Sequence, residues 1–270
     1  MPPKVVTCGP NCTELFVALG LEQYVIGRTN NDHAQTPLEE YAQAYNAIPQ
    51  LCYSNPTIEA MVSSGCDFLY VTDNAVKGDF TVAAVGAYDI NAYVSAATSV
   101  DEVYKEIRDI GKIFGVEEKA EEYITDQQKR VEAVQAAVKG QKPLKVFCYD
   151  NDAGNGSVYT SSGTNIENEL IKMSGGTNIF ESVDKAWISV SLEEILAAEP
   201  DAIIIHDYSS ESVSPSSEKK IETIKSDPIL SQLDCVENDR FIVLPLIDVL
   251  PGIRTADCVE TIFKGLYPNY

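Results

Sequence analysis

The sequence predicts an α/β fold of two lobes with parallel-type sheets, joined by one long helix. Short apolar segments such as 4–8 and 68–71 alternate with helix-like segments, a pattern typical of parallel sheets. From Glu117 to about Lys139 the apolar positions largely keep one face, which predicts a helix of 23 residues. At the standard rise such a helix is about 35 Å long. We therefore expect an N-terminal lobe over 1–116, a bridging helix over 117–142 and a C-terminal lobe over 143–270.

The first lobe opens with a strand, a turn and a helix. The strand is 4–8, the turn is 9–11, and Thr13 is suited to cap a helix that ends at Gly20. The next expected elements are the strand 25–27, the helix 58–64 and the strand 68–71. Ser99 and Glu102 have the spacing of a capping box and predict the start of a further helix.

The second lobe repeats this style without a strict sequence repeat. The segment 144–149 reads as a strand, and the Gly-, Ser- and Asn-rich segment 150–163 reads as a loop. Helices are expected over 166–174 and 192–198, and a strand over 202–206.

Composition narrows the possible partners. The chain has 20 basic and 41 acidic residues, a net charge of −21, which excludes a nucleic-acid partner. No run of about 18 apolar residues occurs, so we expect no membrane span. The beginning at Met1 lacks an apolar targeting segment, which leaves a cytosolic protein and an exported one with a trimmed signal both open. The seven cysteines are odd in number and scattered, and we expect buried thiols rather than a disulfide scaffold.

Short motifs lie at 5–15, 18–20, 55–59 and 67–69 in the first lobe, and at 169–171, 175–180, 190–195 and 199–203 in the second. In their order and spacing, these motifs resemble those of the periplasmic binding proteins of ABC importers, the class with two Rossmann-like α/β lobes joined by a long helix. Cobalamin and ferric-siderophore carriers typify this class, and the resemblance covers nearly the whole chain.

The resemblance implies an extracytoplasmic, monomeric substrate-binding protein, periplasmic or lipid-anchored on the outer face of the cell membrane. Its ligand would lie in a cleft between the lobes and would contain a metal, as a ferric siderophore, haem or cobalamin does, and no intrinsic cofactor is implied. It would deliver that ligand to a membrane permease. By position, Glu59 and Glu193 would dock on permease arginines, with Glu194 as the nearest competitor of Glu193.

Loops that follow the strands supply the candidate ligand contacts. Trp187, the only tryptophan, stands where cobalamin carriers of this class place a cleft tryptophan, and Tyr159 stands where they place another aromatic residue. Thr72 departs from the pattern, because some carriers have tryptophan there. The candidates are Asn11, Cys12, Asn31, His33, Tyr53, Asn55 and Asp73 in the first lobe, and Asp150, Tyr159, Lys185, Trp187, His206, Tyr208, Asp248 and Arg254 in the second.

Ligand chemistry divides these candidates. An anionic ferric catecholate needs several cations, because burying its charge without partners is costly. The plausible cations are Lys77, Lys185 and Arg254. Haem needs an axial tyrosine or histidine, for which Tyr53, His33, His206 and Tyr208 are candidates.

Two other classes of function remain open. Binding of a molybdate-type oxyanion would use a helix N-terminus such as 11–13, and a bare metal ion would need more imidazole than two histidines supply, unless carboxylates replace it. An enzyme acting on a metal chelate would share the two-lobed style. The chain has no phosphate-loop, G-x-G-x-x-G, H-E-x-x-H or nucleophile-elbow motif, so we expect no enzyme and no catalytic residues.

Overall fold

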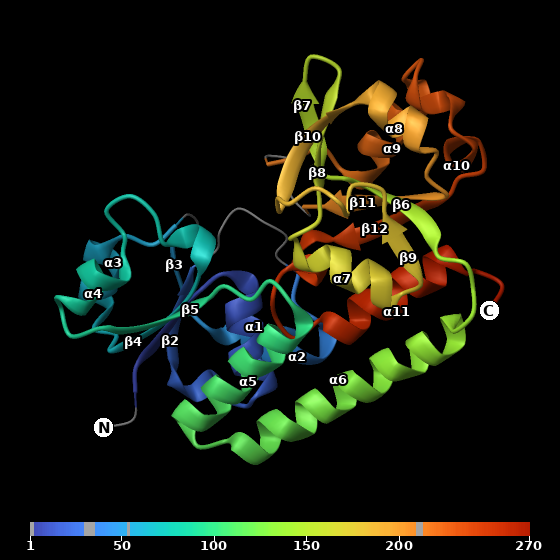
Figure 1. Cartoon of the computed structure of the whole chain (residues 1–270). Helices are drawn as coiled ribbons and strands as arrows, with labels where there is room; N and C mark the ends of the chain where they lie inside the picture. The colour runs from blue at the N-terminus through green and yellow to red at the C-terminus, as the bar shows by residue number, and fades with distance from the viewer. Residues whose placement is uncertain (1–2, 30–35, 53–54, 209–212) are drawn as a thin grey trace. The chain divides into compact units, whose positions relative to one another are not determined.

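The computed structural model describes residues 3–29, 36–52, 55–208 and 213–270 (Figure 1). The predicted α/β architecture, with parallel sheets in two lobes, is confirmed. By contacts the chain divides into two compact units, and the division passes through the long helix rather than beside it. The first unit is Met1–Ala97, Asp101–Tyr123 and Pro251–Ile253; the second is Thr98–Val100, Ile124–Leu250 and Arg254–Tyr270.

The first unit is built on a five-stranded sheet with the order β3-β2-β1-β4-β5, in which every described pair is parallel. The central strand is completely buried, as its four apolar or small residues dictate. The strands are β1 (Val5–Cys8), β2 (Val25–Thr29), β3 (Gln50–Cys52), β4 (Phe68–Thr72) and β5 (Asn91–Ser95). The helices that begin in this unit or at its border are α1 (Pro10–Ala18), α2 (Glu39–Ala47), α3 (Ile58–Ser64), α4 (Val82–Gly86) and α5 (Val100–Phe114), with short 3-10 turns η1 (Glu22–Tyr24) and η2 (Asp73–Ala75).

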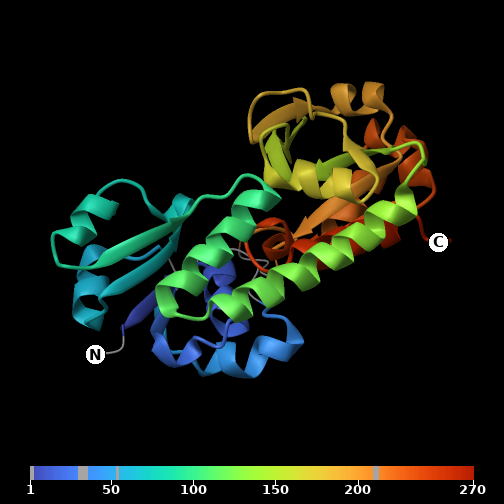
Figure 2. The same cartoon turned by 60° about the horizontal axis from the view of Figure 1, so that its bottom comes forward.

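The predicted long helix is confirmed as α6 (Glu117–Val138), which Figure 2 shows as one uninterrupted helix. Its part after Tyr123 belongs to the second unit, where Arg130 pairs with Asp257 and Glu260 of the last helix, α11 (Thr255–Leu266). Over the described ranges, no helix combines the length and apolar character needed to cross a membrane.

The second unit contains a four-stranded parallel sheet with the order β12-β11-β6-β9. Its strands are β6 (Leu144–Tyr149), β9 (Gly176–Asn178), β11 (Ala202–Asp207) and β12 (Phe241–Pro245). Besides α11, its helices are α7 (Ile166–Met173), α8 (Leu192–Ala198), α9 (Ser217–Ser226) and α10 (Asp234–Glu237), with 3-10 turns η3 (Leu230–Gln232) and η4 (Leu246–Val249). Helices α7 and α11 pack together and against β9 and β12, whereas α9 and α10 pack against β11.

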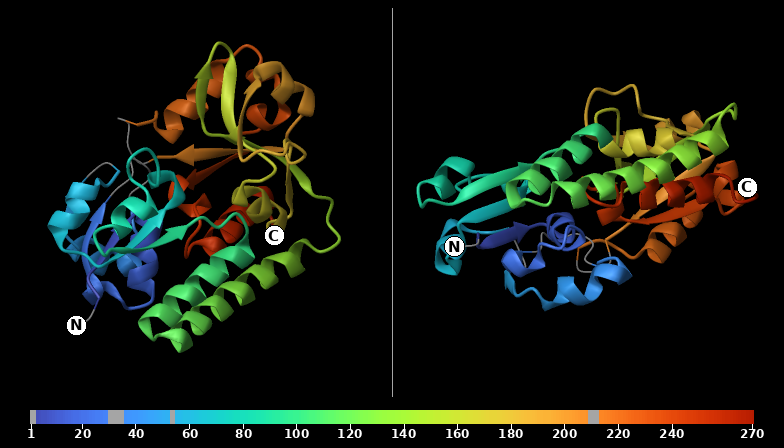
Figure 3. Two further views of the ribbon diagram at one scale, coloured as in Figure 1. Left: turned by 60° about the vertical axis from the view of Figure 1, so that its left-hand side comes forward. Right: turned by 90° about the horizontal axis from the view of Figure 1, so that it is seen from below.

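The expectation that 150–163 is a loop is wrong. The segment forms the antiparallel strands β7 (Asn151–Gly154) and β8 (Ser157–Ser161), drawn in yellow-green in Figures 1 and 3. Between them Asn155 and Gly156 both have positive φ, 55° and 72°, as a two-residue hairpin turn requires. The strand β10 (Trp187–Ser191) pairs with β8 and completes a separate three-stranded sheet.

Six of the seven cysteines are buried. Burial raises the pKa of Cys8 to about 12 and that of Cys235 to about 11, so these thiols stay protonated at neutral pH.

Candidate functional site

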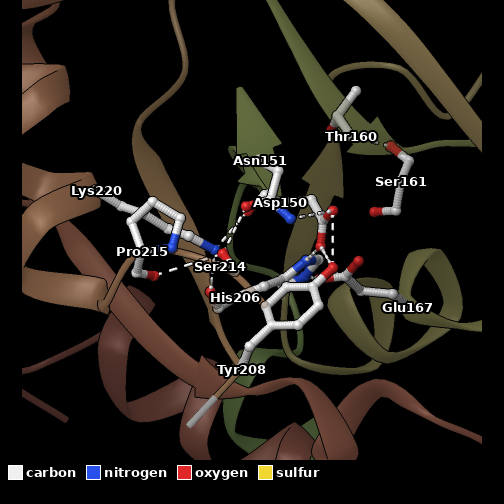
Figure 4. Close-up of polar contacts among 10 residues, drawn as sticks. All are labelled: Asp150, Asn151, Thr160, Ser161, Glu167, His206, Tyr208, Ser214, Pro215 and Lys220. Atoms are coloured by element: carbon white, nitrogen blue, oxygen red, sulfur yellow. Dashed lines mark hydrogen bonds and ion pairs between the residues drawn. The ribbon is translucent and has the colours of Figure 1, made fainter. Parts of the chain in front are cut away.

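In the second unit's parallel sheet, the direction in which the chain adds successive strands reverses between β6 and β11. From β6 the chain continues to β9 on one side, and from β11 it continues to β12 on the other. Open α/β sheets bind ligands beyond the strand ends at such a point. Asp150 directly follows β6, and His206 is the penultimate residue of β11. Their side chains meet at this point (Figure 4).

His206 is fully buried between two carboxylates. Its Nδ1 lies 2.9 Å from Oδ1 of Asp150, and its Nε2 lies 2.8 Å from Oε1 of Glu167. Burial alone would lower the pKa of His206, but the charges and hydrogen bonds of the two carboxylates raise it to about 10. The ring is therefore an imidazolium at neutral pH and donates both of its N–H groups.

Asp150 has a further donor. The Tyr208 hydroxyl donates to both oxygens of Asp150, at 2.9 and 3.0 Å. Burial alone would raise the pKa of each carboxyl group, yet His206 holds both below their ordinary values. Both acids are therefore ionised in the folded protein.

Lys220 of α9 adds a second buried cation. Its Nζ donates to the backbone oxygens of Asp150, at 2.5 Å, and of His206, at 2.7 Å, so that it ties the ends of β6 and β11 together. Its ammonium group also lies 4.9 Å from the centre of the Tyr208 ring. Burial lowers the pKa of Lys220 to about 8. At neutral pH the two negative charges of Asp150 and Glu167 are therefore matched by the two positive charges of His206 and Lys220. Together with Tyr208, we call these residues the buried network.

An aromatic pair lies against this network. Trp187 and Tyr159 stack with ring centres 5.4 Å apart and an interplanar angle of 9°. In the β8–β10 register Trp187 is opposite Ser161 and Tyr159 is opposite Ser189, which makes the two aromatic residues diagonal neighbours on one face. The ring of Trp187 also stands edge-on to that of His206, at 6.1 Å and 77°. Tyr159 is 39% exposed and Trp187 is half-buried, so the pair offers accessible ring surface.

The structure thus brings five of the sequence-predicted residues together: Asp150, Tyr159, Trp187, His206 and Tyr208. Three of them point inward. Both ring nitrogens of His206 and the Tyr208 hydroxyl are already bound to carboxylates, so neither residue presents a donor atom to a ligand in this arrangement. The accessible part of the cluster is the aromatic pair.

Glu167 and Lys220 are absent from the sequence-based candidates, because those candidates follow strands whereas these two residues lie on helices. A signal was present in each helix. Glu167 stands four residues before the buried Ile171, and Lys220 stands four residues before the buried Ile224, so both charges occupy the apolar face. A charged residue in such a position needs a buried partner.

The other candidates of the second unit lie in different surroundings. Arg254 donates from NH1 to Oδ1 of Asp248 at 2.8 Å, and both residues are buried, so the guanidinium charge is matched within the protein. Lys185 is exposed.

Near the amino ends of β6 and β11, a cavity of about 730 Å³ is lined by residues that include Lys145 and Arg240. Both of these cations already donate to backbone oxygens, and the cavity is at the opposite strand ends from the aromatic pair.

In the first unit, Asn11 and Cys12 are buried in the first turn of α1, and Asn11 donates to the backbone oxygen of Pro251 at 2.6 Å. Asn55, Asp73 and Lys77 are exposed. The candidates Asn31, His33 and Tyr53 lie outside the described residues. Within the described part of the chain, no cluster of three or more His, Cys, Asp or Glu side chains has an arrangement suited to a metal ion.

The two candidate docking glutamates are exposed in helical first turns, Glu59 in α3 and Glu193 in α8. The competitor Glu194 is engaged differently. Its carboxylate accepts from the backbone and hydroxyl of Ser191, which completes a capping box at the start of α8.

Comparison with known proteins identifies the family. The model of the family described as periplasmic binding protein matches residues 5–246. The chain belongs to this family. It is 24% identical, over 99% of its length and 81% of the relative's, to an uncharacterised ABC transporter substrate-binding lipoprotein of Bacillus subtilis. It is 23% identical to a vitamin B12-binding protein of Pectobacterium atrosepticum, over 76% of this chain and 72% of that protein.

Among solved structures, the fold is similar to that of a periplasmic binding protein from Veillonella parvula. The TM-score is 0.89 at 26% identity, and the match covers 99% of this chain and 92% of that one. The family membership and this structural likeness agree with the architecture of the two units.

Proposed function

We propose that this periplasmic binding protein is the extracytoplasmic, substrate-capturing component of an ABC importer, and that its ligand is a metal-containing tetrapyrrole, cobalamin or haem. Family membership supports a binding role, and the relative from Pectobacterium atrosepticum is named for vitamin B12. The relative from Bacillus subtilis is named as an ABC transporter lipoprotein, which supports a location outside the cytoplasm.

The observation that carries the ligand class is the aromatic pair of Tyr159 and Trp187. Its stacked rings provide accessible aromatic surface near the strand ends where α/β sheets bind ligands. A tetrapyrrole presents a broad flat face that matches such a surface. Aromatic stacking contributes about 0.5–1.5 kcal/mol beyond the burial of area.

Charge disfavours a ferric catecholate. Such a ligand needs cations that are not already matched, because its own negative charge must be compensated when it is buried. Arg254 is paired with Asp248, and Lys220 is buried among backbone oxygens. Of the basic candidates, the exposed Lys77 and Lys185 remain, and two flexible surface lysines are a weak basis for binding a polyanion.

Fluorescence provides a direct test, because Trp187 is the only tryptophan of the chain. Cyanocobalamin, haem, a ferric hydroxamate, a ferric catecholate and molybdate would each be titrated while tryptophan emission and the melting temperature are followed. We expect cyanocobalamin or haem to quench the emission and raise the melting temperature, because a ligand of the folded state stabilises it. A response to molybdate or the catecholate alone would overturn the proposed ligand class.

Substitution locates the site. Trp187→Ala and Tyr159→Ala should each weaken binding of the responding tetrapyrrole by about tenfold, a loss of about 1.4 kcal/mol, measured by calorimetry. The matched control is Tyr88→Ala, which removes an exposed tyrosine of the first unit. Unchanged affinity in both site variants would show that the ligand binds elsewhere.

Glu59 and Glu193 are proposed to dock on the permease, in preference to Glu194, whose carboxylate caps α8. Glu59→Ala and Glu193→Ala should abolish ligand uptake by the assembled importer while they leave ligand affinity unchanged. A loss of affinity in either variant would contradict this assignment.

A further inference from the structure

Trp187 and Tyr159 lie against the buried network, and not every member of that network can contact a ligand. The network therefore needs a function other than ligand contact. We propose that His206 is a positioning residue: as an imidazolium clamped between Asp150 and Glu167, it holds the indole ring of Trp187 in its ligand-binding orientation. This inference rests on the proposed function of the aromatic pair, and it assigns to His206 a role other than metal ligation.

The first step is that the orientation of the imidazolium is fixed. Asp150 follows β6, Glu167 is in the first turn of α7 and His206 is in β11, so three separate elements converge on one ring. Each nitrogen has its own carboxylate, at 2.9 and 2.8 Å. Rotation of the ring would break at least one charge-assisted hydrogen bond in a site without solvent, and such bonds are the strong ones.

The second step is the contact with the indole. The two rings stand 77° apart with centres 6.1 Å from one another, which is a T-shaped aromatic contact. A neutral imidazole would keep the shape of this contact but lose its electrostatic part. The ring of Tyr159 supplies the second constraint on the indole.

The third step is the set of charges that face His206 from the elements around it. They are Asp150 after β6, Glu167 on α7, and Lys220 on α9, whose ammonium group binds the backbone oxygen of His206. Tyr208 shares Asp150 with His206. Glu167 is the largest of the influences that raise the pKa of His206. Removal of its charge is therefore the most selective way to make His206 titrate near neutral pH.

The decisive variant is Glu167→Gln, which keeps the side-chain length and an acceptor oxygen but removes the charge. We expect its His206 to titrate between about pH 6 and about pH 8, nearer the ordinary range of histidine, whereas His206 of the unsubstituted protein stays protonated there. Nitrogen-15 NMR of the imidazoles measures this directly. The chain has two histidines, and a His33→Gln background leaves the signal of His206 alone.

Two readouts then separate positioning from a purely structural role. In ligand-free Glu167→Gln, the emission of Trp187 should change along the titration curve of His206. The affinity for cyanocobalamin, whose charge is constant over this range, should equal that of the unsubstituted protein at about pH 6 and fall about tenfold by about pH 8. The unsubstituted protein should show neither dependence.

A control variant and a second test variant separate failure of this inference from failure of the proposed function. Glu260→Gln removes an ion-paired carboxylate of Arg130 in the same unit and should leave both readouts flat. If Glu167→Gln does not fold, Asp150→Asn removes the other partner and carries the same expectation. A histidine that titrates while emission and affinity stay flat would overturn the inference. Full affinity in both Trp187→Ala and Tyr159→Ala would instead overturn the proposed function.

Discussion

Each unit of the molecule buries a glutamate near its sheet, and the two are stabilised in opposite ways. In the first unit, Glu106 of α5 accepts hydrogen bonds from neutral groups: the hydroxyls of Tyr70 and Ser95, at 3.3 and 2.7 Å, and the backbone amides of Ala96 and Ala97, at 2.9 and 3.0 Å. In the second unit, Glu167 pairs with the imidazolium of His206.

The two sites differ in how many partners stabilise the buried glutamate. Four neutral donors share the stabilisation of Glu106, and two of them are backbone amides, which only a proline substitution removes. The buried network of the second unit instead balances whole charges, so the loss of one member leaves an unmatched ion away from water. We therefore expect the second unit to be the more sensitive to substitution and to pH.

The largest expected effect is that of His206→Gln. It leaves Asp150 and Glu167 without their common cation, and breaking such a buried pair costs about 3–5 kcal/mol of the free energy of unfolding. Urea unfolding followed by the emission of Trp187 measures this loss in the second unit. A loss below about 1 kcal/mol, the value of an exposed pair, would contradict a charged network.

The pH dependence of stability is the next largest effect. The pKa of His206 is raised from 6.5 to about 10, so its contribution is complete below pH 6.5 and is lost as the pH rises toward 10. The pKa of Lys220 is lowered from 10.5 to about 8, so this group opposes the loss between those two values. We expect stability to fall from pH 6.5 to pH 8, by at most about 1.4 kcal/mol per unit, and then to level off.

Urea unfolding at a series of pH values tests this shape. On the acid side, Asp150 and Glu167 have lowered pKa values, so their stabilisation is complete above the ordinary carboxyl range and is lost as the pH falls through their folded-state values. Lys220→Met should remove the levelling above pH 8, and a curve unchanged by that substitution would show that Lys220 does not titrate as expected.

Part of the fold and part of the candidate site could be predicted from the sequence. Alternation of apolar segments predicted the parallel sheets, and strand-end positions singled out Asp150, His206 and Tyr208, because position after a strand is a local property. That these side chains bind one another depends on β6 and β11 being neighbours, although 52 residues lie between Tyr149 and Ala202. Strand order is set by the packing of the whole unit, and the residues of a single strand do not determine which strand lies beside it.

The hairpin of β7 and β8 was missed for a different reason. Polar composition at 150–163 suggested a loop, whereas the alternation in 157–161 and the Asn155–Gly156 turn were the stronger local signals. Because β8 carries Tyr159 and pairs with the strand of Trp187, the aromatic pair could not be predicted as a pair without this hairpin.

A smaller effect is expected at the neutral site. Glu106→Gln replaces one acceptor oxygen by an NH₂ group that faces donors, and an unmatched buried polar group costs about 1–3 kcal/mol. Amide hydrogen exchange in β5 and α5 follows the first unit, which lacks tryptophan. Glu118→Gln, on the exposed first turn of α6, is the matched control and should leave exchange unchanged. A cost equal to that of His206→Gln would remove the distinction between the two sites.

The smallest effects come from removing one hydroxyl from each site. Tyr208→Phe deletes the donor that serves both oxygens of Asp150, and it should cost about 1.5 kcal/mol because hydrogen bonds to charged groups are the stronger class. Ser95→Ala deletes one of four donors to Glu106 and should cost about 1 kcal/mol, since the backbone amides and Tyr70 remain. The same unfolding and exchange measurements apply. If Ser95→Ala proved the costlier of the two, the carboxylate of the first unit would depend on one donor, and the contrast between shared and single partners would fail.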